Sequence, residues 1–432
     1  MNRHGLILSV LLIALYAWLG LSILRAEEAA PEKLTWTDCV REASKNNPDI
    51  EASWHGWQNA EAVRKGSYSQ FFPQVSVSTG FTRSYQPSSA SGSGMTEYSS
   101  QYSAEATVNQ MVFDGFKTKG GVDQAKAQAR VALASLAGEK SLVSYELKTA
   151  FAQLLFAQEL VRISKDIVGQ RDLNYRLIEM FYQSGKENKG SLLLSKANLS
   201  QAQYELRQAQ RNVEVSQRQL QTTMGRLIIR PVYAVGELVT AEIELNPDFK
   251  KLALRTPAHF QSSASADASA AGITLAQSTL YPQINASATA SRQDSKFVPK
   301  YSGWSAGVSA SWDLFDGGST YFNVKAARAS LQQSLATLRS TDDQTALSLA
   351  EDYKSLVDGV ELVKVTEEAL AAAALRSRIA QEQYRNGLIS FQDFETITNS
   401  FISQQRTTLA ARRDAVLAEA NWEQSRGIGA IP

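Results

Sequence analysis

The chain has 432 residues, enough for two or three ordinary domains or for one elongated body. Its 44 lysines and arginines nearly cancel its 43 aspartates and glutamates, which leaves no basic field to hold nucleic acid. A single cysteine, Cys39, excludes an intrachain disulfide, and the three histidines lie too far apart in the sequence to suggest a zinc site.

The N-terminus has the pattern of a secretory signal. Arg3 and His4 precede an apolar run over residues 6–24, which ends at the small Ala26 before two acidic residues. We expect a signal peptide over residues 1–26, removed by cleavage after Ala26. An uncleaved anchor is the alternative, because about 18 apolar residues nearly span a bilayer. No later segment is apolar enough for a transmembrane helix, so we expect any membrane crossing by the mature chain to use strands.

Five motifs recur downstream at two fixed offsets. The pairs that are 202 residues apart are Phe113-Asp114-Gly115 with Phe315-Asp316-Gly317, Tyr182–Gly185 with Tyr384–Gly387, and Gly225 with Gly427. The pairs that are 209 residues apart are Pro48 with Pro257 and Phe72-Pro73-Gln74 with Tyr281-Pro282-Gln283. Such self-similarity predicts a duplicated protein. We expect a first structural repeat over residues 27–225, an inter-repeat equatorial segment over 226–256 and a second repeat over 257–432.

Each repeat predicts the same order of elements: a helix, two strands, a long helix and a second long helix that returns. The expected ranges in the first repeat are 49–71, 73–83, 102–113, 114–185 and 190–225. Those in the second repeat are 258–280, 282–292, 303–315, 316–387 and 391–427. The first helix of each repeat follows a proline, Pro48 or Pro257, which suits a first helical turn.

The long helix of the first repeat carries a coiled-coil pattern. Its apolar residues advance in steps of 7, 4, 4, 3, 7 and 7 residues, at Leu136, Val143, Leu147, Phe151, Leu154, Val161 and Val168. This spacing predicts an apolar seam between packed helices. At 1.5 Å per residue, the chain from Asp114 to Gly185 would reach about 100 Å as a helix, a length that suits a conduit across a periplasm.

The expected strands alternate between apolar and small polar residues, as over residues 304–312 and 75–81. This pattern is typical of a membrane β-barrel, and also of a sheet with one buried face. Four strands are too few to close a barrel, so we expect three chains to supply twelve strands, above a tube of twelve long helices. The Ser- and Gly-rich residues 83–101 would then form an extracellular loop.

No catalytic or cofactor-binding pattern stands out in the sequence. Gly185-Lys186 lacks the upstream glycine and the following Ser or Thr of a phosphate-binding loop, and HExxH and CxxC patterns are missing. We therefore expect a passive channel without cofactor or metal, and not an enzyme. The alternative is a periplasmic coiled-coil adaptor or scaffold protein anchored by an uncleaved N-terminus, although an adaptor would lack strand pairs between its helices.

Taken together, the motifs resemble those of the TolC family of outer-membrane efflux proteins. The matching features are Leu34-Thr35-Trp36-Thr37-Asp38, Asn46-Asn47-Pro48, the strand starts at residues 72–74 and 281–283, the Phe-Asp-Gly corners between strand and helix, and the Tyr-x-x-Gly turns. The resemblance covers residues 33–429. It implies a mainly α fold with a small β part: a trimeric 12-stranded outer-membrane β-barrel continued by an α-helical coiled-coil tunnel in the periplasm.

The resemblance also implies a function and partners. The chain would be the exit duct of a tripartite efflux or type I secretion system, located in the cell outer membrane with a periplasmic extension. It would form a homotrimer in outer-membrane lipids and dock a periplasmic adaptor (membrane fusion) protein and an inner-membrane pump of the RND, ABC or MFS type.

By the same resemblance, the periplasmic gate lies at the helix turns. The family's gating tyrosine corresponds to Tyr384 and its constricting acidic ring to Asp393, with Glu395 close by. The turns at Tyr182, Gly185 and Gly387 would face the adaptor.

Three positions depart from the family's gate. The second acidic position holds Thr396, the position of the basic gate partner holds Ile389, and the first-repeat equivalent of Asp393 is Ser191. The gate salt bridge of the family is therefore absent here, and the interaction that closes the tunnel is not identified by the resemblance.

Overall fold

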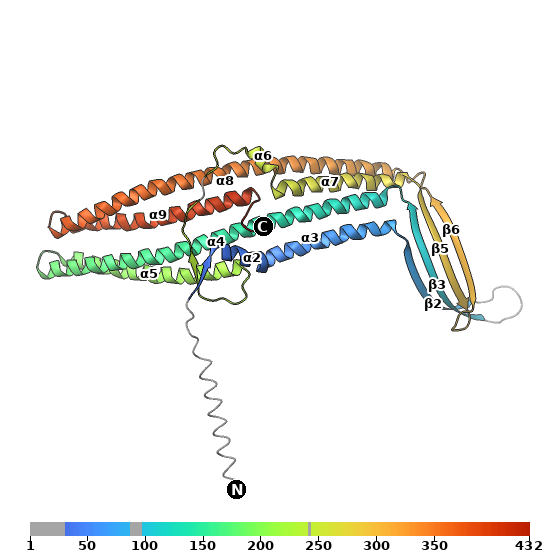
Figure 1. Ribbon diagram of the computed structural model, residues 1–432, viewed down its shortest axis with the longest axis horizontal. Coiled ribbons are helices and arrows are strands. Elements are labelled where there is room, and N and C mark those ends of the chain that lie inside the picture. Colours follow the sequence, from blue (N-terminus) through green and yellow to red (C-terminus); the bar gives the residue numbers. More distant parts are fainter. Residues whose placement is uncertain (1–30, 87–96, 241–242) are drawn as a thin grey trace, which may run out of the picture.

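The chain folds into a long helical rod with a β-sheet at one end (Figure 1). The structure is a computed structural model and describes residues 31–86, 97–240 and 243–432. The expected signal peptide, residues 1–26, and the tip of the expected extracellular loop, residues 87–96, lie outside the described residues. None of the helices in the described part of the chain has the length and apolar content needed to cross a membrane.

The expected duplication is confirmed by the elements and their bounds. The first repeat contains β1 (Glu32–Thr35), α2 (Trp36–Asn46), α3 (Pro48–Gly66), η1 (Ser67–Phe71), β2 (Gln74–Gln86), β3 (Glu97–Phe113), α4 (Lys117–Gln183) and α5 (Lys189–Thr223). The second part contains β4 (Val232–Val235), α6 (Phe249–Ala253), α7 (Pro257–Gln277), η2 (Ser278–Leu280), β5 (Gln283–Asp294), β6 (Tyr301–Ser311), α8 (Ser319–Arg385) and α9 (Phe391–Ser425). Both α4 and α8 have 67 residues, and both α5 and α9 have 35.

Local sequence signals start the shorter helices. Asn47 accepts hydrogen bonds from the backbone N–H groups of Asp49 and Ile50, at 2.9 and 3.1 Å, while Pro48 occupies the first turn of α3. Proline is tolerated there because the first N–H groups of a helix have no intrahelical partner. Thr256 and Pro257 repeat the arrangement at the start of α7.

The four long strands form one antiparallel sheet in the order β2-β3-β5-β6, so β2 and β6 are its edges. The expected range 303–315 of the last strand is wrong at both ends. The strand starts at Tyr301 and stops at Ser311, because Ser311 pairs with Gln283, the first residue of β5, and in the described part of the chain no partner strand continues beyond it. The expected loop 83–101 is likewise too long, since β2 continues to Gln86 and β3 begins at Glu97.

The corners between sheet and long helices use aspartate, but not as expected. We expected α4 and α8 to begin at Asp114 and Asp316, and they begin three residues later. From the loop, each carboxylate accepts a hydrogen bond from the N–H group of a threonine in the first turn, at 2.6 Å for Thr118 and 2.7 Å for Thr320. At the first corner Gly115 is required, because a Cβ there would lie 2.3 Å from the carbonyl oxygen of Ser278 and φ is +65°.

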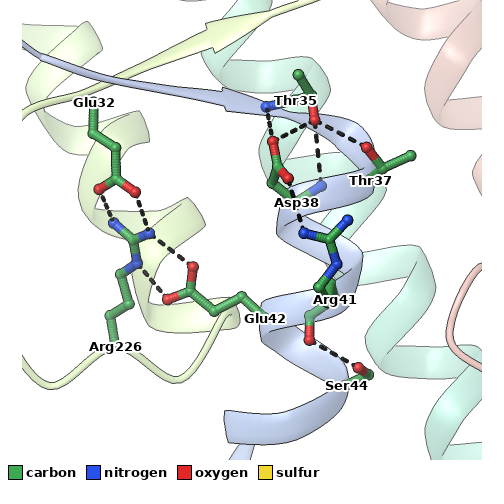
Figure 2. Close-up of polar contacts among 8 residues, drawn as sticks. All are labelled: Glu32, Thr35, Thr37, Asp38, Arg41, Glu42, Ser44 and Arg226. Atoms are coloured by element: carbon green, nitrogen blue, oxygen red, sulfur yellow. Dashed lines mark hydrogen bonds and ion pairs between the residues drawn. The ribbon is translucent and has the colours of Figure 1, made fainter.

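The middle of the rod holds elements that the sequence analysis did not identify. Strands β1 and β4 pair in parallel, and α2 follows β1 directly. Figure 2 shows how Arg226, just beyond α5, fixes this region: its guanidinium donates to Glu42 at 2.5 and 2.7 Å and to Glu32 at 2.8 and 3.1 Å. Arg226 belongs to the inter-repeat segment, so this segment helps to fix the middle of the rod, which we call the equator. We call Arg226 with Glu32 and Glu42 the clasp.

Helix α4 is the central element of the rod and packs against α3, α5, α7 and α9. At the equator its apolar seam meets α2, β1 and the end of α5. The fully buried side chains of that cluster include Val143, Leu147, Leu154, Cys39 and Leu220. The coiled-coil positions expected from the sequence thus supply the main core.

Candidate functional site at the helix turns

The end of the rod opposite the sheet consists of two helical hairpins, as Figure 1 shows. The first hairpin is α4 with α5, and the second is α8 with α9. Each turns at a glycine with positive φ, Gly185 at +75° and Gly387 at +71°. We call this end the tip.

Both turns are Schellman motifs. The N–H groups of Gly185 and Lys186 donate to the carbonyls of Tyr182 and Phe181, at 3.0 and 2.8 Å. In the second hairpin the same bonds link Gly387 to Tyr384 and Leu388 to Gln383. These bonds satisfy the last carbonyls of each helix and need a residue that adopts the left-handed conformation, which glycine does without strain.

The returning helices begin with polar caps. Asn188 accepts from the N–H of Ser191 at 3.0 Å at the start of α5. At the start of α9, Ser390 accepts from the N–H of Asp393 at 3.1 Å, and its hydroxyl donates to the Asp393 carboxylate at 2.6 Å. These bonds hold Asp393 in place at a helix N-terminus, where a negative charge is favourable. Its side chain is exposed in the single chain.

Tyr384 lies in the interior of the tip, between the two hairpins. It is 3 % exposed, and its ring stacks on Phe394 at 4.8 Å between centroids. Together with Ile178 of α4 and with Ala380 and Phe391, these rings form the apolar cluster of the tip. The first-repeat equivalent, Tyr182, is exposed, so the duplication gives two tyrosines with different environments.

The hydroxyl of Tyr384 donates to the Oε1 atom of Glu187 at 2.7 Å and so links the second hairpin to the turn of the first. Burial, and then the hydrogen bond to this carboxylate, raise the pKa of Tyr384 well above its ordinary value. The tyrosine remains protonated and keeps its role as a donor. Sequence reasoning did not identify Glu187, because it lies in the irregular turn and has no helical periodicity.

Glu395 is placed in the interior, not on an open surface. Its Oε1 atom accepts from Arg171 of α4 at 2.6 Å and from Asn198 of α5 at 2.7 Å. Arg171 also donates to Asn399, one turn further along α9. The side chains of Arg171 and Glu395 are only 8 % and 7 % exposed. Sequence reasoning missed Arg171, Asn198 and Asn399, because their spacing shows nothing until the two hairpins are packed together.

The remaining positions of the family's gate have diverse environments. Ser191 is buried, Ile389 packs against the apolar cluster of the tip, and Thr396 is exposed and donates to the carbonyl of Gln392. The structure thus brings Tyr384 and Glu395 into the same packed interior, and leaves Asp393 outside it.

The chain is similar to outer-membrane efflux proteins over most of its length. A family model described as outer membrane efflux protein matches residues 39–226 and 250–427. The outer membrane efflux protein BepC of Brucella suis is 20% identical over 415 residues, which cover 94% of this chain and 88% of that protein.

Solved structures agree in fold. The CmeC outer membrane channel of Campylobacter jejuni matches with a TM-score of 0.81 at 15% identity, over 90% of this chain and 85% of that one. The outer membrane protein VceC of Vibrio cholerae matches with a TM-score of 0.77 at 18% identity, over 92% and 96% of the two chains. At such low identity these likenesses show the architecture.

Proposed function

Because the chain belongs to the outer membrane efflux protein family, we propose that three copies of it form the exit duct of a tripartite efflux or type I secretion system. It is an outer-membrane efflux channel of the cell and not an enzyme, and channels of this family form trimers and work with efflux pumps. The periplasmic adaptor considered as the alternative is not favoured by a family match that extends over both repeats.

The sheet is the observation that carries this proposal. Its two edges, β2 and β6, have no partner among the residues that the structure describes, and unpaired strand edges are not tolerated in lipid. Pairing of β6 with β2 of the next copy, three times over, closes twelve strands into a barrel. We propose that this barrel crosses the outer membrane and that residues 87–96 join β2 to β3 on the extracellular side.

The two faces of the sheet support the same arrangement. One face carries large apolar side chains that are exposed in the single chain, at Val75, Val77, Phe81, Trp304 and Val308. The opposite face, by strand alternation, carries mainly serine, glycine, threonine and asparagine. An apolar outside and a polar inside are the requirements for a water-filled barrel in a bilayer.

We assign the gate to the tip. Since the basic gate partner is replaced by Ile389, the closing contact we propose is the bond from Tyr384 to Glu187, which joins the hairpins by side chains alone. Asp393 contributes one exposed carboxylate per chain, and three-fold symmetry would convert it into a ring at the periplasmic mouth. The turns at Gly185 and Gly387 project furthest and would meet the adaptor, with the pump behind it.

Two measurements test the proposal. The mass of the purified protein in detergent should correspond to a trimer, and the protein added to a planar lipid bilayer should produce discrete conductance steps. A stable monomer, or a trimer that never conducts, would contradict the duct.

A further inference from the structure

We propose that Arg171, Glu395, Asn198 and Asn399 form a hydratable seam between the two hairpins, which sets how readily the tip opens. The inference rests on the proposed function, since it concerns the opening of the proposed duct. Glu395 is the one member of the seam that the resemblance places near the gate, whereas Arg171, Asn198 and Asn399 are not among the gate positions. The seam uses a buried ion pair in a layer where an apolar layer would also pack.

The seam joins both hairpins at one level. Arg171 of α4 and Asn198 of α5 belong to the first hairpin, and Glu395 and Asn399 of α9 to the second. Glu395 receives bonds from both helices of the first hairpin, at 2.6 Å from Arg171 and 2.7 Å from Asn198. Separating the hairpins at the tip must break all of these contacts together.

Apolar layers lie on both sides of this polar one. On α4, Ile167 precedes Arg171 by four residues and Ile178 follows it by seven, so the three lie on a similar face of the helix. Ile167 packs in a cluster with Ile402 and Leu409 of α9, and Ile178 in the apolar cluster of the tip. A leucine or methionine pair at the level of Arg171 would therefore continue a dry seam.

The ion pair changes the cost of opening. Buried pairs roughly break even against well-packed apolar residues in the closed state, because the loss of hydration offsets the attraction. When the hairpins part, water returns to the guanidinium and the carboxylate and restores that hydration. An apolar layer exposed in the same way would gain nothing from water. The charged seam thus holds the two hairpins together in the closed tip, and opening costs less free energy than it would with an apolar layer at the same level.

A second bridging pair offers a matched control. Arg406 of α9 contacts Glu205 of α5, also from one hairpin to the other, but the two side chains are 37 % and 25 % exposed. Solvent already reaches this pair in the closed state, so breaking it should alter the closed and open states to a similar degree.

The experiment compares variants of the full-length protein in planar lipid bilayers and measures the fraction of time that each channel is open. Glu395→Gln retains the shape of the side chain but leaves the Arg171 charge unpaired in the closed layer. Because opening hydrates that charge, we expect the open fraction to rise roughly tenfold or more. Replacing both partners, in Arg171→Met/Glu395→Met, should lower the open fraction below that of the natural protein. The control Glu205→Gln should change it less than about twofold.

The outcomes separate the seam from the duct. If the natural protein conducts and Glu395→Gln opens no more often than the natural protein, the proposed role of the seam is wrong. The same holds if the double methionine variant opens as readily as the natural protein, and this variant decides the question should Glu395→Gln fail to assemble. If the natural protein itself produces no channels, the proposed function fails before the seam is tested.

Discussion

The tip and the equator use the same helix-ending motif for different tasks. A Schellman glycine ends α4 and α8 at the tip, and another ends α5 and α9 at the equator. At the equator, a Cβ on Gly225 would lie 2.1 Å from the carbonyl oxygen of Asn46, and one on Gly427 would lie 2.0 Å from Cδ of Pro257. At the tip, the same positions of Gly185 and Gly387 face open space.

This difference separates a closely packed end of the helices from an open one. At the equator the missing Cβ allows one helix end to lie directly against the next element, with Arg226 clasping two carboxylates beside it. At the tip the glycine only reverses the chain, and the hairpins are joined by side-chain contacts such as that of Tyr384 with Glu187. We infer that the equator holds the protomer together while the tip changes shape.

The largest expected effect comes from placing alanine at the two kinds of glycine. Gly225→Ala should lower the free energy of unfolding by about 2–5 kcal/mol, because a left-handed conformation costs a non-glycine residue about 1–2 kcal/mol and the clash with Asn46 adds about 1–3 kcal/mol. Gly185→Ala should show the conformational term alone, about 1–2 kcal/mol. Thermal unfolding followed by circular dichroism measures both, and equal losses would remove the distinction between equator and tip.

The next effect tests the ion-pair clasp of the equator. Arg226→Met should cost about 1.5–3 kcal/mol, since its mostly buried guanidinium bonds to two carboxylates. Arg41→Met removes the exposed pair between Arg41 and Asp38, both on α2, and should cost about 0–1 kcal/mol. Denaturation of the two variants side by side provides the comparison, and similar losses would mean that the clasp contributes no more than a surface pair.

The same clasp predicts a dependence on pH. The hydrogen bond from Arg226 lowers the pKa of Glu32 below its ordinary value of 4.5. A carboxylate with a lowered pKa in the folded state adds stability above the pKa of the unfolded chain, and this is lost as the pH falls through the folded value. The melting temperature should therefore fall below about pH 4.5 less steeply in Arg226→Met than in the natural protein. If the melting temperatures of the two proteins fall equally steeply as the pH is lowered, Glu32 does not contribute to this dependence.

At the tip, the hydroxyl of Tyr384 can be removed without disturbing its ring. Tyr384→Phe should keep the stack on Phe394 but lose the bond to Glu187, worth about 0.5–1.5 kcal/mol, and raise the open fraction in bilayers by roughly two- to tenfold. Tyr182→Phe is the matched control, because it changes the equivalent exposed tyrosine of the first repeat. An open fraction that is unchanged in Tyr384→Phe would move the closing contact elsewhere.

Much of the fold could be predicted because the duplication presents each sequence motif twice, once in each repeat. The long helices, the order of elements and the sheet followed from two offsets and from periodicity. The small equatorial elements were missed, since strands of four residues such as Glu32–Thr35 have no period and exist only by pairing with a distant partner. The strand ends were misplaced for a similar reason, because the register of pairing, and not the local sequence, stops β6 at Ser311.

The site was predicted less completely than the fold. Tyr384 was identified by resemblance, but its partner Glu187 occupies a turn position without a pattern. Glu395 was grouped with Asp393 as an acidic neighbour, yet two residues along a helix are about 200° apart, so one side chain faces inward and the other outward. Only the packing of both hairpins reveals that the inward one meets Arg171.

The smallest expected effect on the fold, and the sharpest test of the mouth, is Asp393→Ala. The carboxylate caps α9 through Ser390 and should stabilise the helix by about 0.3–1 kcal/mol, so the variant should fold and assemble. In a trimer the three exposed carboxylates would lie around one axis, and rings of acidic side chains favour cations. Reversal potentials in a salt gradient should therefore shift toward lower cation selectivity in the variant, and block by multivalent cations should weaken. Glu395→Gln, whose carboxylate is turned inward toward Arg171, should leave selectivity unchanged even where it alters opening. If Asp393→Ala conducts and selects as the natural protein does, Asp393 is only a helix cap, and the constriction lies at the level of Tyr384.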